Sequence, residues 1–351
     1  MRLLIGGSST FLVHLKQFSD TLNSLGVESK LVFDGDYADG FPSRKIRNWF
    51  QTKKKFNKLI NEFKPDAIFV DRQRHFGINA LKANIPLFVL LRGHYWSEIY
   101  WNKRTMYKPF QKRIALWQWD KLAKEIFNGA TAIFPICKYL EKITNKFVPD
   151  KSTNVFFEGV DASKWYQVKG MNLKHPCVGL LQRASWWGKT SEMLILKKVL
   201  EKMPDVNFYW AGDGPLRERV LSELDKYDNF HWLGNLQYPD KVREYLSEID
   251  VYALITGMDL APLTLKEAQL MKKPVIATNV GGNPEMMIDG KTGFLVEQGN
   301  HEQIIARLSL LLADKELSKK MGNDGRKFIE DTFNWKLVAK NFIEMIKPYL
   351  K

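Results

Sequence analysis

Short apolar runs alternate with amphipathic stretches along the whole chain. The first run, residues 3–5, leads into a Gly-Gly turn, and apolar residues then recur at three- and four-residue steps from Leu12 to Leu25. This spacing predicts a strand followed by a helix that ends at Gly26. Alternation of this kind is typical of parallel sheets covered by helices, so we expect an α/β protein with doubly wound sheets.

The same pattern occurs twice. In the first half, further strands are expected at residues 31–33, 67–70, 87–91, 132–136 and 155–157. From Pro176 onward, strands are expected at 177–181, 206–210, 251–255, 274–277 and 294–296, and helices at 192–202, 216–224, 241–247, 265–271 and 302–312. The polar stretch 161–174 separates the two halves and predicts a domain boundary. Open sheets of this type bind ligands beyond the carboxyl ends of their strands.

Length and composition support a two-domain enzyme. The 351 residues suit two domains, and 45% hydrophobic with 26% charged residues is an ordinary globular composition. Two cysteines exclude a disulfide framework and a cysteine-based zinc site. The first apolar run is too short for a signal peptide, and no apolar stretch reaches the length of a membrane-spanning helix, about 18 residues. We therefore expect a cytoplasmic location.

The positive charge is concentrated in one half. The formal net charge is +14, from 53 Lys and Arg against 39 Asp and Glu. Residues 1–170 hold 28 basic and 15 acidic residues, or +13, and residues 171–351 hold 25 and 24, or +1. Such an excess favours a polyanionic partner: a nucleic acid, an anionic membrane or a phosphorylated molecule.

Candidate chemistry gathers in residues 259–296. Asp259 follows a predicted strand and Glu267 lies near the start of the next helix, so both carboxylates are expected in one crevice, where they can accept hydrogen bonds from sugar hydroxyls. The turn Gly281-Gly282-Asn283-Pro284-Glu285 offers backbone N–H groups where a ligand approaches closely. Seen alone, these residues also fit ordinary turn glycines and a solvated glutamate.

This segment resembles the donor-binding segment of glycosyltransferase family 4, in which two glutamates precede a helix, a proline-led strand and a Gly-Gly-x-Pro-Glu turn. Further motifs of that family follow one another along nearly the whole chain. They are Gly6-Gly7 with His14 and Gly26, Glu158-Gly159-Val160-Asp161, Val178-Gly179 with Arg183 and Lys189, Gly212-Asp213-Gly214-Pro215-Leu216, His231-Trp232-Leu233-Gly234 and Asp250-Val251.

The resemblance implies the GT-B fold, in which two Rossmann-like domains face each other across a cleft. It implies an N-terminal acceptor domain (1–168), a C-terminal domain that binds a nucleotide-sugar donor (169–331), and a final helix (332–351) that crosses back onto the first domain. A plain surface helix is the alternative for the last segment. The implied activity is hexosyl transfer from a nucleotide-sugar to an acceptor, with retention of configuration.

The resemblance also assigns roles to residues. Arg183 and Lys189 would bind the diphosphate and neutralise the leaving group. Glu267 would accept the ribose hydroxyls, and Asp259 would lie near the donor sugar. The other donor-binding candidates are Gly6, Gly7, Gly212, Gly214, Leu260, Ala261, Leu263, Gly281, Gly282 and Glu285. This chain has Asp259 where the family has glutamate, and Leu260-Ala261-Pro262 where it has Gly-Phe-Gly, so donor chemistry is expected to differ.

Two histidines are candidates on the acceptor side. His94 follows the strand at 87–91 and matches the family histidine near the reacting sugar; a structural role is the alternative for it and for His14. No residue qualifies as a covalent nucleophile, so we expect front-face attack, assisted by the departing phosphate. Asp34-Gly35-Asp36 resembles the metal-binding Asp-x-Asp of another glycosyltransferase fold. It follows the second strand of the N-terminal domain and not of the donor domain, so we expect a solvated turn. We expect no cofactor and no metal.

Basic and aromatic residues are interleaved in segments 41–58 and 95–119. Such a surface suits an anionic membrane that carries a lipid-linked acceptor, with the enzyme attached peripherally at the cytoplasmic face. The alternative is a solvated charged face over a tryptophan-containing core. Candidate acceptor-side or membrane-side residues, besides His14, are Lys53, Lys54, Lys55, Arg92, Tyr95, Trp96, Arg104, Lys108, Lys112 and Arg113.

Other functions are compatible with the same motifs. Related double-Rossmann folds host nucleotide-sugar epimerases and phosphorylases. The Asp259 replacement and the altered loop after it also fit a catalytically weak homologue that acts as a scaffold. Charge alone favours nucleic acid, but no segment resembles a nucleic-acid-binding module, so we expect no nucleic-acid partner.

Overall fold

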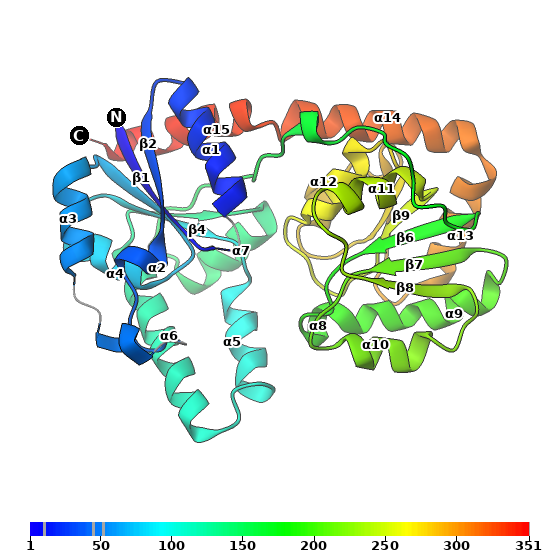
Figure 1. Ribbon diagram of the computed structural model, residues 1–351, viewed down its shortest axis with the longest axis horizontal. Coiled ribbons are helices and arrows are strands. Elements are labelled where there is room, and N and C mark those ends of the chain that lie inside the picture. Colours follow the sequence, from blue (N-terminus) through cyan, green and yellow to red (C-terminus); the bar gives the residue numbers. More distant parts are fainter. Residues whose placement is uncertain (10–11, 44–45, 51–52, 351) are drawn as a thin grey trace. The chain divides into compact units, whose positions relative to one another are not determined.

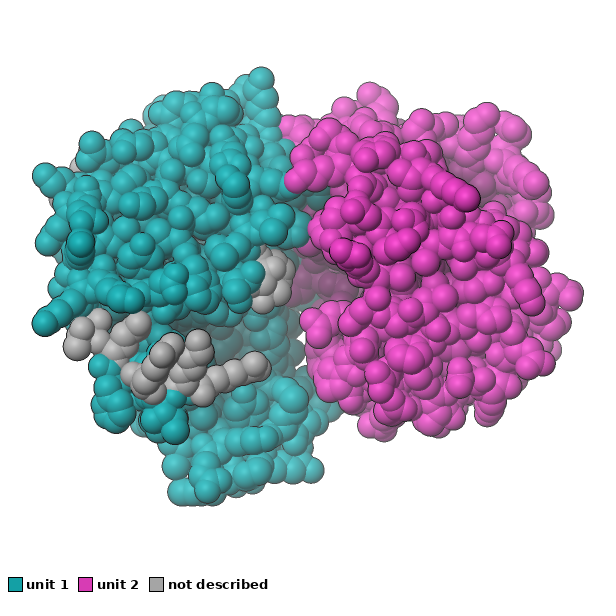
Figure 2. Space-filling model, in the orientation of Figure 1, with its two compact units in different colours: residues 1–160, 335–351 teal, residues 161–334 magenta. Residues whose placement is uncertain are grey.

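The chain forms two compact units, each an α/β unit with one parallel sheet (Figure 1). The computed structural model describes residues 1–9, 12–43, 46–50 and 53–350. Unit 1 comprises residues 1–160 and 335–351, and unit 2 comprises residues 161–334 (Figure 2). The sequence placed the boundaries at 168 and 331. The first lies earlier because residues beyond 160 bind unit 2: the Gln167 side chain donates to the Met271 carbonyl at 3.0 Å, and the Val168 N–H donates to Ser247 Oγ at 3.1 Å.

Unit 1 contains a five-stranded parallel sheet in the order β2-β1-β3-β4-β5. Its central strands are buried along their whole length, as expected for a sheet covered on both faces. The strands are β1 (Arg2–Gly7), β2 (Glu28–Phe33), β3 (Ala67–Asp71), β4 (Leu87–Leu91) and β5 (Ala132–Pro135).

The helices of unit 1 include the last one in the chain. Phe342 on α15 lies in the core of unit 1, with ring centroids 4.8 Å from Phe69, 5.1 Å from Phe18 and 5.4 Å from Phe134. The helical elements are α1 (Leu12–Ser24), α2 (Asp34–Tyr37), η1 (Ile46–Phe50), α3 (Lys54–Phe63), α4 (His75–Lys82), α5 (Tyr95–Arg104), α6 (Phe110–Gly129), α7 (Lys138–Phe147), α15 (Trp335–Ile346) and η5 (Lys347–Tyr349).

Unit 2 contains a six-stranded parallel sheet in the order β11-β10-β9-β6-β7-β8. Numbered within the unit and taken from the other edge, this is 3-2-1-4-5-6, the order of dinucleotide-binding Rossmann folds. The strand order therefore reverses between β6 and β9. The strands are β6 (Cys177–Leu181), β7 (Asn207–Ala211), β8 (Phe230–Gly234), β9 (Val251–Leu254), β10 (Val275–Thr278) and β11 (Gly293–Val296).

Helices complete unit 2 around a core of buried aliphatic and aromatic side chains. They are η2 (Ala162–Lys164), α8 (Trp187–Thr190), η3 (Ser191–Ile195), α9 (Leu196–Lys202), α10 (Arg217–Leu224), α11 (Asp240–Glu248), α12 (Leu263–Leu270), η4 (Asn283–Glu285), α13 (His301–Ala313) and α14 (Lys315–Thr332). Across the described residues, every helix falls short of the length and apolarity that crossing a membrane requires.

Two expected elements differ in the structure. Residues 155–157 form no strand: the Phe156 N–H donates to the Pro135 carbonyl at 2.8 Å, but this segment forms no continuous ladder with β5. The helix expected at 192–202 is divided into η3 and α9. The β8 strand, which only the family resemblance indicated, lies at the edge of the sheet beside β7.

Candidate active site

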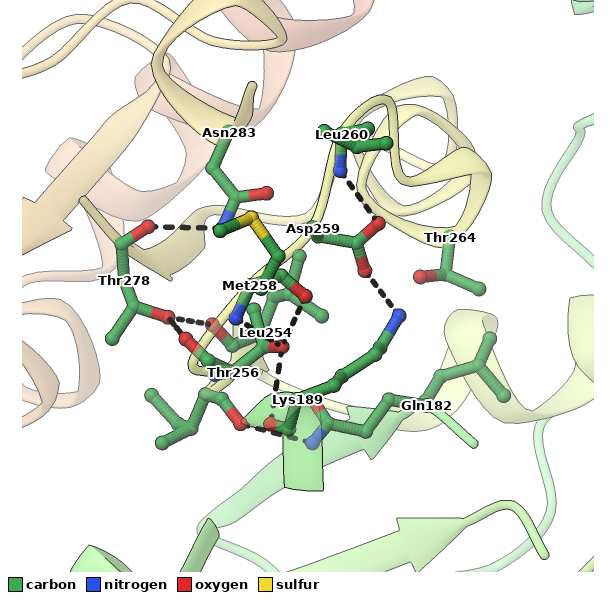
Figure 3. A network of polar contacts seen from close by, with 12 residues as sticks. Gln182, Lys189, Leu254, Thr256, Met258, Asp259, Leu260, Thr264, Thr278 and Asn283 are labelled. Carbon is green, nitrogen blue, oxygen red and sulfur yellow. Dashed lines mark hydrogen bonds and ion pairs between the residues drawn. The ribbon is translucent and has the colours of Figure 1, made fainter. Parts of the chain in front are cut away.

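The candidate site of unit 2 lies where the strand order reverses. Parallel strands β6 and β9 are neighbours, and the segments after their carboxyl ends bear Lys189, on α8, and Asp259, in the loop before α12. Their side chains form an ion pair between Lys189 Nζ and Asp259 Oδ2 (Figure 3). Both side chains are about four-fifths buried, being 20% and 17% exposed. The structure thus joins two of the predicted site residues at the position where open α/β sheets bind ligands.

The glycine turn after β10 holds Asp259 in place. The Asp259 carbonyl accepts the Gly282 N–H at 2.9 Å, and Asp259 Oδ1 accepts the Leu260 N–H at 2.9 Å. Gly281 has a φ of 56°, and a Cβ there would lie 2.0 Å from the Asp259 carbonyl oxygen. Gly281 and Gly282 therefore position the Asp259 loop, a role that the sequence reasoning did not assign to them.

Buried polar side chains support the same loop (Figure 3). Thr278 Oγ1 donates to the Thr256 carbonyl at 2.7 Å and accepts the Thr256 N–H at 2.9 Å. Asn283 Nδ2 donates to the Thr278 carbonyl at 2.9 Å, and Gln182 Nε2 donates to the Ile255 carbonyl at 2.9 Å. Sequence reasoning missed Gln182, Thr256 and Thr278, and it named Asn283 only as part of the glycine turn. The available signal for Gln182, Thr256 and Thr278 was a hydrogen-bonding residue at the end of a buried apolar run.

Glu267 lies on α12 and is 4% exposed. Its Oε1 accepts a hydrogen bond from the Tyr238 hydroxyl at 3.1 Å. Burial raises the pKa of the Glu267 carboxyl to about 7, while the hydrogen bond from Tyr238 and the charge of Lys266 oppose this rise. A carboxyl group that titrates near neutrality can accept or donate a hydrogen bond when a hydroxylated ligand binds.

Arg183 is exposed and lies just beyond β6. The turn after β7 holds the backbone on either side of it: a Cβ on Gly212 would lie 2.0 Å from the Gln182 carbonyl oxygen, and one on Gly214 would lie 2.3 Å from that of Ala184. These two glycines allow close backbone packing that fixes the place of Arg183. Among the other donor candidates, Leu260 and Ala261 are buried, and Leu263 and Glu285 are partly exposed.

In unit 1, His94 caps the N-terminus of α5. Its Nδ1 accepts the Ser97 N–H at 3.2 Å, which leaves the proton of the neutral ring on Nε2. Burial lowers the pKa of His94, while its own backbone and Glu98 oppose this shift. His94 therefore presents a neutral N–H donor at physiological pH.

Arg92 does not lie on the surface, as a membrane-side role would require. Its Nε donates to Asp71 Oδ1 at 2.7 Å, and its Nη1 pairs with Glu158. Asp71 also accepts the Ser8 hydroxyl at 2.7 Å. All three charged side chains are buried because β1, β3 and β4 end together and the chain returns beside them at residue 158. The Arg92 guanidinium is therefore part of a buried ion-pair cluster and not of an exposed surface.

The other candidates on the acceptor side differ in how far their side chains are exposed. The buried Tyr95 hydroxyl donates to Asp120 at 2.9 Å, so Tyr95 packs inside unit 1. Trp96 is partly exposed, and its ring stacks on the exposed Phe147 at 4.6 Å. Gly6 and Gly7 are buried at the end of β1, and His14 is partly exposed on α1. The exposed candidates are Lys53, Lys54, Lys55, Arg104, Lys108, Lys112 and Arg113. Within the basic segment 41–58, positions 44–45 and 51–52 lie outside the described residues.

The Asp-x-Asp segment is only half solvated. Asp34 is buried in α2, 3.7 Å from Arg74 Nη1, and burial raises its pKa to about 6, whereas Asp36 is exposed. The expectation of a solvated turn is therefore wrong for Asp34. The position of this residue under α4 explains the difference, because Arg74 immediately precedes that helix.

Within the described residues, a cluster of His175, Cys177 and Asp250 has groups that could hold a metal ion, because their ligand atoms lie within 4.8 Å of one another. His175 Nδ1 lies 2.8 Å from Asp250 and its Nε2 lies 3.1 Å from Glu248, and these two contacts raise the pKa of His175. Cys177 is the first residue of β6, His175 precedes that strand, and Asp250 precedes β9. The cluster therefore lies at the amino ends of these strands, at the opposite edge of the sheet from Lys189 and Asp259.

Comparisons with known proteins find similar sequences and similar structures. Residues 165–328 match the profile of glycosyl transferases group 1. The chain is 30% identical over 295 residues to the sulfoquinovosyl transferase SQD2 of Arabidopsis thaliana, covering 79% of this chain and 55% of that protein. It is 25% identical over 224 residues to the alpha-maltose-1-phosphate synthase of Mycolicibacterium smegmatis, covering 57% of each. The chain thus spans about half the length of these relatives.

Solved structures share the fold of the whole chain. Sucrose-phosphate synthase from Thermosynechococcus elongatus aligns with a TM-score of 0.74 at 14% identity, covering 99% of both chains. Anabaena Alr3699/HepE, solved with UDP and glucose, aligns with a TM-score of 0.70 at 15% identity, also covering 99% of both. The chain has the GT-B fold, and residues 165–328, which make up most of unit 2, match the glycosyl transferases group 1 family, in agreement with the sequence motifs.

Proposed function

We propose that this protein transfers a sugar from a nucleoside-diphosphate sugar to an anionic, lipid-linked acceptor at a membrane. Transfer retains the configuration of the sugar and needs no metal. Unit 2 binds the donor and unit 1 the acceptor. The observation that carries this proposal is the Lys189–Asp259 ion pair at the strand-order reversal of a Rossmann sheet, with the buried Glu267 on the helix that follows Asp259.

The charges of unit 2 suit a diphosphate. Lys189 has three N–H donors, so it can keep Asp259 as a partner and still donate to a phosphate oxygen. Arg183, exposed on the neighbouring loop, adds a planar fork for a second oxygen. Because residues 171–351 are almost neutral overall, Arg183 and Lys189 supply the positive charge that neutralises the diphosphate. Asp259 and Glu267 provide carboxylate oxygens for sugar hydroxyls.

The proposed reaction needs no covalent intermediate with a protein nucleophile. The bond between the anomeric carbon and the phosphate oxygen breaks as the acceptor hydroxyl forms its bond on the same face of the sugar. The acceptor proton passes to the departing phosphate, whose developing charge Lys189 and Arg183 stabilise. Neutral His94, with its proton on Nε2, is the proposed donor of a hydrogen bond to the reacting sugar.

A donor panel tests the proposal. The full chain is incubated with UDP-, GDP- and ADP-sugars and an extract of membrane lipids, and transfer is measured with and without EDTA. We expect transfer from one donor class, undiminished by EDTA, and an NMR spectrum of the product that shows the donor's anomeric configuration. Lys189→Ala should lower kcat/KM by 100-fold or more, which corresponds to about 3 kcal/mol of lost transition-state stabilisation.

Lys197→Ala is the matched control. Lys197 also pairs with a carboxylate of unit 2, Glu223, but it lies on α9, which α8 and η3 separate from the end of β6 along the chain. Its removal should leave kcat/KM within about twofold of the original. Equal losses in the two variants, or epimerised donor without any acceptor, would contradict the proposal. Absence of nucleoside-diphosphate binding would instead support a scaffold.

A further inference from the structure

Helix α6 presents a row of apolar side chains to solvent. Phe110, Ile114 and Trp117 are 75%, 41% and 61% exposed. Their spacing of four and three residues places them on one face of the helix. Single exposed hydrophobic residues are ordinary, but a contiguous row on one helix marks an interaction surface. Tyr100 on α5 and Met106 in the connecting turn are exposed as well.

Cationic side chains surround this row. Between Ile99 and Trp119 the sequence holds five Lys or Arg residues and no Asp or Glu. The Arg104 guanidinium carbon lies 3.5 Å from the centroid of the Tyr100 ring, and Lys121 Nζ lies 5.6 Å from that of Trp117. Long cationic side chains beside aromatic rings can keep their charge in a polar layer while their stems cover apolar surface.

The hairpin of α5 and α6 is built to hold this surface outward. The inner face of α6 packs in unit 1 through buried Leu122, Ile126 and Phe127, and Tyr95 on α5 donates to Asp120 on α6 at 2.9 Å. In Figure 1 the turn between the two helices projects from the rest of unit 1. The exposed row therefore belongs to a helix whose opposite face is anchored in a core.

We propose that this hairpin surface, defined by Tyr100, Phe110, Ile114 and Trp117 with the flanking cations, docks on an anionic phospholipid bilayer. Helix α6 would lie in the interface, with its apolar row at the boundary of head groups and acyl chains and its cations among lipid phosphates. The proposal deepens the proposed function, which places the acceptor at a membrane. A nucleic acid would satisfy the cations but would leave Ile114 and Met106 without a partner.

Vesicle flotation tests this proposal without donor or acceptor. The full chain is mixed with phosphatidylcholine vesicles that contain about 30 mol% phosphatidylglycerol, or none, at about 50 and 500 mM NaCl. We expect binding to the anionic vesicles at low salt, at least tenfold weaker binding at high salt, and little binding to neutral vesicles. The double variant Phe110→Ser/Trp117→Ser should bind the anionic vesicles at least tenfold less.

The matched control is Ile288→Ser/Leu310→Ser, two exposed apolar residues of unit 2, which should bind as the original chain does. Melting curves of all variants are recorded to check that each one folds. The proposal is overturned if the hairpin variant binds like the original, if neutral vesicles bind equally well, or if single-stranded RNA competes the chain off the vesicles. Flotation needs no catalysis, so a failed transfer assay would not contradict membrane docking. Failed flotation would contradict membrane docking, whereas sugar transfer is tested separately with a detergent-dispersed acceptor.

Discussion

At the scale of single residues, Glu267 combines burial with a pKa of about 7. In the unfolded chain the carboxyl has an ordinary pKa of 4.5, so between pH 4.5 and about 7 the folded state keeps a proton that the unfolded state has lost. The contribution of Glu267 to the free energy of unfolding therefore falls as pH rises through this range and is level above it. The full difference amounts to about 3 kcal/mol.

Glu267→Gln should remove this dependence, because the amide is neutral at every pH. We expect the stability of the variant relative to the original chain to rise by about 3 kcal/mol between pH 4.5 and 8, measured by urea unfolding at several pH values. The comparison cancels the contribution of Asp34, whose pKa is also raised. Parallel pH profiles for the two chains would show that Glu267 keeps an ordinary pKa.

Individual site residues were predictable where they follow the end of a predicted strand. Lys189 and Asp259 are 70 residues apart, yet both follow apolar runs, and parallel strands bring such ends to one edge. Arg92 follows a strand end too, but its burial depends on Asp71 and Glu158. Whether an arginine faces solvent or a pair of carboxylates is decided by tertiary packing, which no local pattern records.

At the scale of elements, the turn after β10 is coupled to the loop after β9. Gly281→Ala would combine a positive φ of 56° with a Cβ placed 2.0 Å from the Asp259 carbonyl. The first effect costs about 1 kcal/mol, and the forced shift of the loop adds roughly 2 kcal/mol. We expect the free energy of unfolding of unit 2 to fall by about 3 kcal/mol. The proposed transferase activity should fall with it, because the Asp259 loop must move.

Gly290→Ala separates the two effects. Gly290 also has a positive φ, 71°, but no atom lies within 4 Å of the position of a Cβ. Denaturant unfolding should therefore show a loss of about 1 kcal/mol for this variant, and activity should be retained. Equal losses for the two substitutions would mean that backbone strain alone matters and that the turn does not position Asp259.

Long apolar runs made the strands predictable, since a strand buried on both faces has few polar residues. The residues at 87–91 and 177–181 form strands over the whole expected ranges. Short elements were not predictable: α8 has four residues, too few to show a helical period, although it carries Lys189. The segment 155–157 is as apolar as a strand because it covers the core of unit 1, where Phe156 lies 5.1 Å from Phe18.

At the scale of the whole molecule, the last helix belongs to the first unit. Residues 335–351 pack with residues 1–160, so unit 1 is complete only when the chain end has been added. The Trp335 indole donates to Gln17 at 2.8 Å, and a Cβ on Gly159 would lie 2.5 Å from the Trp335 ring. The spacing of the last apolar residues predicted a helix, but only the family resemblance indicated which domain receives it.

Phe342→Ala should show that α15 is part of the core of unit 1. The ring is fully buried among Phe18, Phe69 and Phe134, and its removal should cost about 3–5 kcal/mol. Hydrogen exchange followed by mass spectrometry should detect faster exchange in β1, β3 and β5, with the strands of unit 2 unchanged. Leu308→Ala, at a fully buried position of the unit 2 core, should give the reverse pattern. If Phe342→Ala instead accelerates exchange evenly in both units, the two units unfold as one, and α15 does not complete a separate core.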